Sequence, residues 1–272
     1  MADSALELAA VREALQSRLL VELMSAAIQK EFVLKGGMAM RAVHSSVRYT
    51  KDIDLDADPK YSTSRLQGIV RRAIQRALSS GLIEDPVVTE PKQTLTTLRW
   101  KISGTQAASH IPVNLTVEVS RRSSSLAAHV IEKLLPSSFG DQAGVKIQVL
   151  DSQAIAVTKI QALIDPHRQA PRDLFDLHVL IEAGIPDPAD LLAELPNAAT
   201  FLPSALAELW QKIEAMTYQQ FVNEVIPYLP ASTAEAIDDK AFDDMRITVA
   251  TRVETWLKVA AESTSKLSDS SS

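Results

Sequence analysis

The chain of 272 residues contains no cysteine, only 8 glycines and 5% aromatic residues. Without cysteine it forms no disulfide, has no thiolate to bind zinc and has no thiol nucleophile. No apolar run approaches the roughly 18 residues that span a bilayer, and residues 1–10 lack the basic and apolar regions of a signal peptide. The sequence therefore excludes thiol chemistry and predicts a cytoplasmic protein with no membrane partner.

The chain does have a large apolar fraction and an uneven distribution of charge. Its 46% hydrophobic residues can form a sizeable core in one large or two ordinary domains. Residues 1–150 carry 19 Lys and Arg against 15 Asp and Glu, whereas residues 151–272 carry 9 against 19. The two parts therefore have net charges of +4 and −10, which favours two lobes with a boundary near residue 150.

The apolar periodicity also changes near residue 150. Before it, the pattern predicts helices over 5–31, 38–44 and 62–80, and strands over 32–34, 47–56, 87–89, 97–102, 113–120 and 146–150. After it, the pattern predicts only helices, over 152–164, 173–183, 188–195, 203–214, 218–225, 234–236 and 243–260. We therefore expect an α/β (α+β) lobe with a mixed sheet over 1–150, an all-helical lobe over 151–261 and a disordered Ser-rich tail over 262–272.

Three aspartates alternate along the predicted strand 47–56. Asp52, Asp54 and Asp56 project from one face, while the apolar residues between them anchor the other face in the core. Three like charges on one face repel one another, and a divalent cation relieves the repulsion. Carboxylate oxygens suit Mg²⁺ or Mn²⁺. For an isolated D-x-D pattern the plainer interpretation is a solvated turn.

Two other features bear on this strand. Glu118 is the only acid on the predicted strand 113–120, and if that strand lies beside Asp52 it supplies the third carboxylate of a two-metal site. Otherwise Glu118 is a surface glutamate. Gly36-Gly37 lies between a predicted strand and a helix, where missing side chains let backbone N–H groups approach a phosphate.

The segment 60–83 is basic. It holds five cations and no acid: Lys60, Arg65, Arg71, Arg72 and Arg76. Such a segment attracts a polyanion such as a triphosphate or RNA. An ordinary solvated helix face is the alternative interpretation.

A second constellation lies in the helical lobe. On the predicted helix 152–164 the apolar residues face the core, which leaves Lys159 free to reach a triphosphate as a point charge. Asp173 and Asp176 are three residues apart on the next helix and share a face. They orient Lys159 or Arg172, or act on the substrate hydroxyl; alternatively, Asp173 is an acid favoured by the helix dipole. The five histidines are too scattered to predict a metal site.

In their order along the chain, these motifs resemble the AbiEii/AbiGii toxin-like nucleotidyltransferases of the DNA polymerase β-type superfamily. The resemblance rests on Lys35-Gly36-Gly37, Arg48-x-Thr50-x-Asp52-Ile53-Asp54-Leu55, Lys159-x-x-Ala162-Leu163 and Arg172-Asp173-x-x-Asp176-Leu177. It covers about residues 30–185. The family often has proline where this chain has Val47, a departure that concerns only the shape of the loop.

The resemblance implies a minimal nucleotidyltransferase lobe followed by a helical lobe, with Mg²⁺-dependent transfer of a nucleoside monophosphate from an NTP. In characterised relatives the acceptor is the 3′ end of tRNA, and the enzymes are toxins of type IV-like toxin–antitoxin or phage-defence systems, which implies a cognate antitoxin as partner. The resemblance assigns nucleotide binding to Gly36, Gly37, Arg48, Thr50 and Lys159, metal binding to Asp52 and Asp54 and less directly to Glu118, and the essential downstream acid to Asp173 or Asp176.

Two other functions fit the same residues. The same chemistry can act on a small hydroxyl-bearing acceptor such as an aminoglycoside, which suits the acidic helical lobe, or on a protein side chain. The chain can also be a non-catalytic module that binds a nucleotide or a partner. The intact set of Asp52, Asp54 and Lys159 argues against the non-catalytic function.

Overall fold

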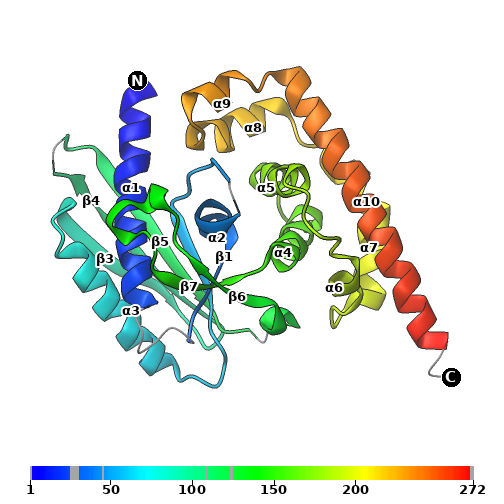
Figure 1. Ribbon diagram of the computed structural model, residues 1–272, viewed down its shortest axis with the longest axis horizontal. Helices are drawn as coiled ribbons and strands as arrows, with labels where there is room; N and C mark the ends of the chain where they lie inside the picture. The colour runs from blue at the N-terminus through cyan, green and yellow to red at the C-terminus, as the bar shows by residue number, and fades with distance from the viewer. Residues whose placement is uncertain (1, 25–30, 45, 108, 123–124, 270–272) are drawn as a thin grey trace. The chain divides into compact units, whose positions relative to one another are not determined.

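The structure is a computed structural model that describes all residues except 1, 25–30, 45, 108, 123–124 and 270–272 (Figure 1). The chain forms two compact units, residues 1–124 with 130–150 and residues 125–129 with 151–272. The sequence prediction placed 125–129 in the first lobe. This segment, the 3₁₀ helix η1 (Ser125–His129), belongs to the second unit because the His129 carbonyl accepts a hydrogen bond from the Asp151 N–H at 2.9 Å.

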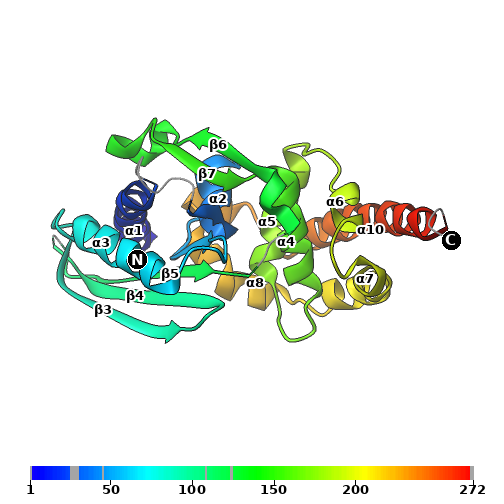
Figure 2. The same cartoon turned by 90° about the horizontal axis from the view of Figure 1, so that it is seen from below.

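A seven-stranded mixed sheet forms the centre of the first unit, in the order β3-β4-β5-β2-β1-β7-β6 (Figures 1 and 2). Its strands are β1 (Val33–Lys35), β2 (Asp52–Asp56), β3 (Ile83–Gln93), β4 (Thr97–Gln106), β5 (Pro112–Ser120), β6 (Val130–Leu134) and β7 (Lys146–Leu150). The central strand β2 pairs antiparallel with β1 and parallel with β5. The predicted mixed sheet followed by a helical region is confirmed.

Among the described residues, three α-helices and one 3₁₀ helix accompany the sheet: α1 (Ala2–Leu23), α2 (Gly36–Val43), α3 (Thr63–Leu78) and η2 (Ser137–Gln142). Helix α1 packs against α3, β5 and η2, while α2 packs against β1 and β2. The Ser62 hydroxyl caps α3 by accepting a hydrogen bond from the Arg65 N–H at 3.3 Å, as its position before the helix predicts. The part of the first predicted helix that covers residues 25–30 lies outside the described residues.

The sheet differs from the prediction at two strands. The expected strand 47–56 forms a ladder only from Asp52, because side chains take the place of strand partners before it: Ser46 Oγ accepts from the Arg48 N–H and Thr50 Oγ1 from the Asp52 N–H, both at 3.2 Å. Strand β6 was not predicted. Its side chains are exposed or half-buried at the sheet edge, so it lacks the apolar alternation of a covered strand.

The second unit is helical. Its α-helices are α4 (Ser152–Ile164), α5 (Pro171–Glu182), α6 (Ala189–Ala193), α7 (Ala198–Glu214), α8 (Tyr218–Glu224), α9 (Ala231–Glu235) and α10 (Asp239–Asp269), with the 3₁₀ helix η3 (Ile226–Tyr228) before α9. Helix α7 begins five residues before the predicted start, so Pro203 lies inside it. Within the part of the chain that the structure describes, no helix is both long enough and apolar enough to cross a membrane.

The predicted disordered tail is wrong for residues 262–269, which continue helix α10. Its hydroxyl groups find partners along the helix itself: Thr264 Oγ1 donates to the Ala260 carbonyl at 2.9 Å and Ser265 Oγ to the Ala261 carbonyl at 3.1 Å. A Ser-rich composition is therefore compatible with helix here, because each of these hydroxyls is satisfied one turn back. The last part of the predicted tail, 270–272, lies outside the described residues.

Candidate active site

The aspartate strand lies in the middle of the sheet. Ile53 and Leu55 are fully buried, while Asp52, Asp54 and Asp56 are half-buried on the opposite face, as the alternation of a strand requires. One face of β2 thus anchors the strand in the core. The other face presents three carboxylates close to the chain turn that precedes α2.

The glycine turn approaches Asp54 more closely than any other residue type would allow. Gly36 has φ +67°, and a Cβ placed on it would lie 2.3 Å from Asp54 Oδ2. A Cβ on Gly37 would lie 3.1 Å from Thr50 Oγ1 and 3.2 Å from Arg48 Nη2. Since β1 ends at Lys35 and α2 begins at Gly36, the first turn of α2 is held directly against the aspartate strand.

Asp56 forms an ion pair with Lys35. In the antiparallel register of β1 and β2, Lys35 lies opposite Asp54, and its side chain reaches along the strand to Asp56. The ion pair relieves part of the repulsion that three carboxylates would otherwise exert on one another.

Glu118 lies on the strand next to the aspartates. The β2–β5 register pairs Asp54 with Glu118, so the neighbouring-strand condition of the prediction is met. Arg99 on β4, opposite Glu118, binds this carboxylate through Nε at 2.7 Å and also through Nη2. Sequence reasoning missed Arg99, although its position two strands from Asp54 follows once the β4–β5 register is known.

No ready metal cage is present in the described residues: no group of three or more His, Asp or Glu side chains is arranged to hold an ion. The donor set nevertheless fits Mg²⁺, because proteins commonly bind it through one or two carboxylates together with substrate phosphates. Asp52 and Asp54, two residues apart on one strand face, supply such a pair. Glu118 adds a third only if its ion pair with Arg99 opens.

Arg48 and Thr50 support the glycine turn from within the protein. Arg48 is 4% exposed and Thr50 9% exposed, and both lie against Gly37. The Arg48 Nη1 group donates to the Tyr49 carbonyl at 3.3 Å. These contacts hold the backbone in place beneath the turn, so any role of Arg48 in nucleotide binding is exerted from a buried position.

In the second unit, Lys159 lies between two carboxylates. Its Nζ is 2.9 Å from Asp173 Oδ1 and 2.6 Å from Asp176 Oδ2, and all three side chains are at most 8% exposed. Arg168 Nη2 holds the other oxygen of Asp173 at 2.8 Å. Helices α4 and α5 and the loop between them therefore bring together two cations and two carboxylates.

The expectation that Lys159 is free of the core is wrong. Lys159 is buried with α4, because this helix presents apolar residues to several neighbours and leaves little of its surface to solvent. A buried ammonium group requires compensating charge, which Asp173 and Asp176 provide. The sequence left open whether these acids orient Lys159; in the structure both form ion pairs with it. Sequence reasoning missed Arg168, which lies on the loop between α4 and α5.

The basic segment 60–83 is largely neutralised by acids from elsewhere in the chain. Four of its five cations form ion pairs: Lys60 with Asp58, Arg65 with Glu31, Arg71 with Glu90 and Arg76 with Glu22. The bidentate bond from Arg71 holds the pKa of Glu90 below its ordinary value. The segment thus carries less free positive charge than its sequence indicates.

A mixed sheet with a tight glycine turn against a strand of spaced carboxylates is the arrangement expected from the resemblance to nucleotidyltransferases. The family model of the nucleotidyl transferase AbiEii toxin, a type IV toxin–antitoxin system, matches residues 18–246, which is most of the chain. The protein therefore belongs to this family: it is a nucleotidyltransferase toxin of a type IV toxin–antitoxin system. Membership implies an NTP substrate and an antitoxin partner.

Two crystal structures from Helicobacter pylori are similar to the whole chain. A candidate nucleotidyltransferase has 18% identity and a TM-score of 0.50, with 98% of this chain and 99% of that chain covered. JHP933 has 19% identity and a TM-score of 0.50, with 99% and 97% covered. At these identities the likeness supports the fold. None of the curated proteins compared with the chain matches it.

Proposed function

We propose that the protein transfers a nucleoside monophosphate from an NTP to the 3′ hydroxyl of tRNA, with Mg²⁺ (or Mn²⁺) held by Asp52 and Asp54. The observation that carries this proposal is the close approach of the Gly36 backbone to the Asp54 carboxylate. It brings the glycine turn and the aspartate strand within one contact distance. Both parts are needed where a metal ion and a triphosphate bind together.

The reaction requires positioning and charge neutralisation. The acceptor hydroxyl attacks the α-phosphorus in line, the bond to the leaving pyrophosphate breaks, and the hydroxyl proton passes to a base. When bound, Mg²⁺ supplies positive charge to the phosphates and lowers the pKa of the attacking hydroxyl. The backbone N–H groups at Gly36 and Gly37 bind phosphate oxygens, while Asp52 and Asp54 hold the metal.

Lys159, Asp173 and Asp176 are assigned to triphosphate binding and its support. In this proposal Lys159 supplies the charge that binds phosphate, and its two carboxylate partners hold the ammonium group in one place. Asp176 is fully buried and contacts Lys159 at the shorter distance, so of the two acids it is the better candidate for the one that positions the lysine. Asp173 shares its charge with Arg168.

An alternative acceptor is a small cationic molecule. Two observations favour it over RNA: the cations of segment 60–83 are mostly paired, and residues 151–272 carry a net charge of −10. A small-molecule reaction would show little dependence on salt concentration. Transfer to tRNA would fall steeply as salt increases, because phosphate contacts release counterions.

The test is incubation of the purified protein with Mg²⁺, each α-³²P-labelled NTP and total tRNA. A parallel reaction uses periodate-oxidised tRNA, which has no 3′ hydroxyl. We expect label on intact tRNA only, and none with Asp52→Asn or Asp54→Asn. Asp58→Asn, in the exposed turn after β2, is the matched control and should keep full activity. Label on both tRNA forms, or activity in the Asp52 and Asp54 variants, contradicts the proposal.

A further inference from the structure

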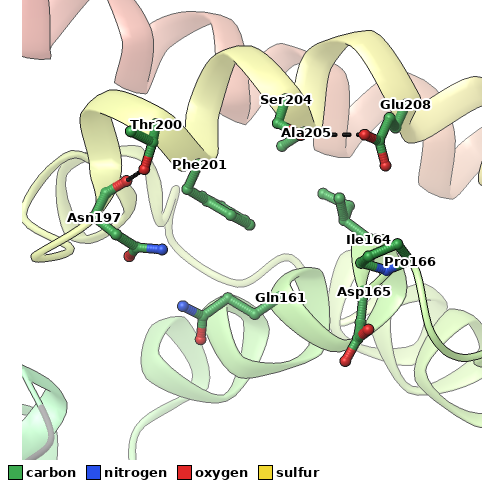
Figure 3. A pocket seen from close by; sticks show the side chains of 10 residues that line it. All are labelled: Gln161, Ile164, Asp165, Pro166, Asn197, Thr200, Phe201, Ser204, Ala205 and Glu208. Atoms are coloured by element: carbon green, nitrogen blue, oxygen red, sulfur yellow. Dashed lines mark hydrogen bonds between the residues drawn. The ribbon is translucent and has the colours of Figure 1, made fainter.

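A cavity of about 370 Å³ lies between helices α4 and α7 in the second unit (Figure 3). One wall comes from the end of α4 and the loop after it, and the other from the first three turns of α7. The volume is within the range of cavities that hold small organic ligands. No residue assigned to the transfer reaction lines it.

The two charged side chains that line the cavity, Asp165 and Glu208, are both acidic. Figure 3 shows the amides of Gln161 and Asn197 at one end and Glu208 toward the other end, with the Phe201 ring between them; the Asp165 carboxylate points away from Glu208. Neither Lys nor Arg lines it, so its formal charge is −2. The wall therefore disfavours anions.

The two carboxylates are only partly satisfied. Glu208 accepts a hydrogen bond from Ser204 Oγ at 3.2 Å, and Asp165 accepts one from the His167 N–H at 2.8 Å. Within the described residues neither carboxylate forms an ion pair. The nearby cation Lys212 forms no ion pair with them in the described residues; its Nζ donates to the backbone carbonyls of Asp165 at 2.7 Å and Arg168 at 3.3 Å.

We propose that this cavity binds an aliphatic diamine or polyamine. One ammonium group would pair with Glu208, and a second would donate to the amide oxygens of Gln161 and Asn197. The methylene chain between them would pack on Phe201 and its apolar neighbours. Ammonium groups near an aromatic face gain further electrostatic attraction, and charge-assisted hydrogen bonds are the strongest available to such a ligand.

The bound ligand would also stabilise the loop between α4 and α5. Asp165 is the first residue of this loop, and its backbone carbonyl accepts a hydrogen bond from Lys212. Arg168 on the same loop holds Asp173 in the buried cluster. Ligand binding in this cavity does not depend on the proposed transfer reaction. Failure of one proposal can therefore be distinguished from failure of the other.

Isothermal titration calorimetry with 1,4-diaminobutane and spermidine on the full chain tests the proposal. 1,4-Butanediol, which has the same length and no charge, is the ligand control and should not bind. Glu208→Gln should weaken diamine binding about tenfold or more, since a charge-assisted hydrogen bond is lost. The matched variant Glu214→Gln changes an exposed acid on the same helix outside the cavity, and should bind within about twofold of wild type.

Phe201→Ala provides an independent variant that keeps both carboxylates. It should weaken binding about threefold or more through loss of the aromatic contact. Absence of diamine binding overturns the proposal, as does equal binding of butanediol. Equal losses in Glu208→Gln and Glu214→Gln, or wild-type affinity in Phe201→Ala, would show diffuse attraction to an acidic surface and overturn it as well.

Discussion

Gly36 and Asp54 are in such close contact that a Cβ on Gly36 would lie 2.3 Å from the carboxylate oxygen Oδ2. The two residues come from different elements, α2 and β2, and Gly36 also has φ +67°. Glycine is required at position 36 for two reasons: the positive φ, and the lack of space for a Cβ.

Gly36→Ala should therefore abolish transfer and destabilise the fold. Gly81 is a matched control, because it has φ +71° but a Cβ added to it would meet no atom within 4 Å. Gly81→Ala should lower the free energy of unfolding by about 1–2 kcal/mol from backbone strain alone. Gly36→Ala should cost more, since Asp54 must also move. Urea unfolding and the transfer assay measure both effects; equal destabilisation with retained activity would contradict this prediction.

Replacing Lys159 should show how strongly the stability of the fold depends on the buried ion pairs. Lys159→Met leaves Asp173 and Asp176 without their shared cation, and should lower the free energy of unfolding by about 3–5 kcal/mol. The double variant Lys159→Met/Asp176→Asn should lose clearly less than the sum of the single changes, because the two groups are coupled. Additive losses in urea unfolding would show that they do not interact.

An exposed pair offers the comparison. Lys258 and Glu254 lie one turn apart on α10 and form an ion pair at 2.8 Å. Lys258→Met should change the free energy of unfolding by about 0.5 kcal/mol or less, since solvent screens the pair. A loss as large as that of Lys159→Met would indicate that burial is not the cause.

The ion pair between Arg99 and Glu118 should control metal dependence. Arg99→Gln releases the carboxylate opposite Asp54, and should lower the Mg²⁺ concentration that gives half-maximal transfer. Glu118→Gln should raise this Mg²⁺ concentration several-fold, because the metal site loses one charged ligand. Magnesium titrations of the two variants measure the effect, and unchanged titration curves in both would remove Glu118 from the metal site.

Burial of His178 predicts a pH effect on stability. Desolvation holds the pKa of His178 below its ordinary value of 6.5, against the smaller opposing attraction of Glu182, and its Nδ1 has no partner in the described residues. Below about pH 6.5 the unfolded chain therefore binds a proton that the folded chain binds less readily, and the free energy of unfolding falls. His178→Gln should lose less stability than wild type between pH 7.5 and 5.5 in urea unfolding. Equal losses would contradict the assignment.

Local patterns in the sequence predicted much of the fold. The alternation of Asp52, Ile53 and Asp54 indicated a strand with one polar face, and helix α4 was predicted with its observed bounds. These features depend on neighbours within one turn or one strand. The prediction failed where the deciding contact was not visible as a pattern: the edge strand β6 has little apolar alternation, and the Ser-rich end of α10 is helical.

The sequence by itself determined the residues of the candidate site and their chemistry: a Gly-Gly turn, a strand of carboxylates and a downstream lysine with two acids. Only the tertiary structure decided which charges remain available. Lys35 pairs with Asp56, Arg99 with Glu118 and Lys159 with Asp173, across 21, 19 and 14 residues respectively. The physical reason is that a salt bridge depends on strand register and helix packing, which place side chains from separate elements together and which no single stretch of sequence specifies.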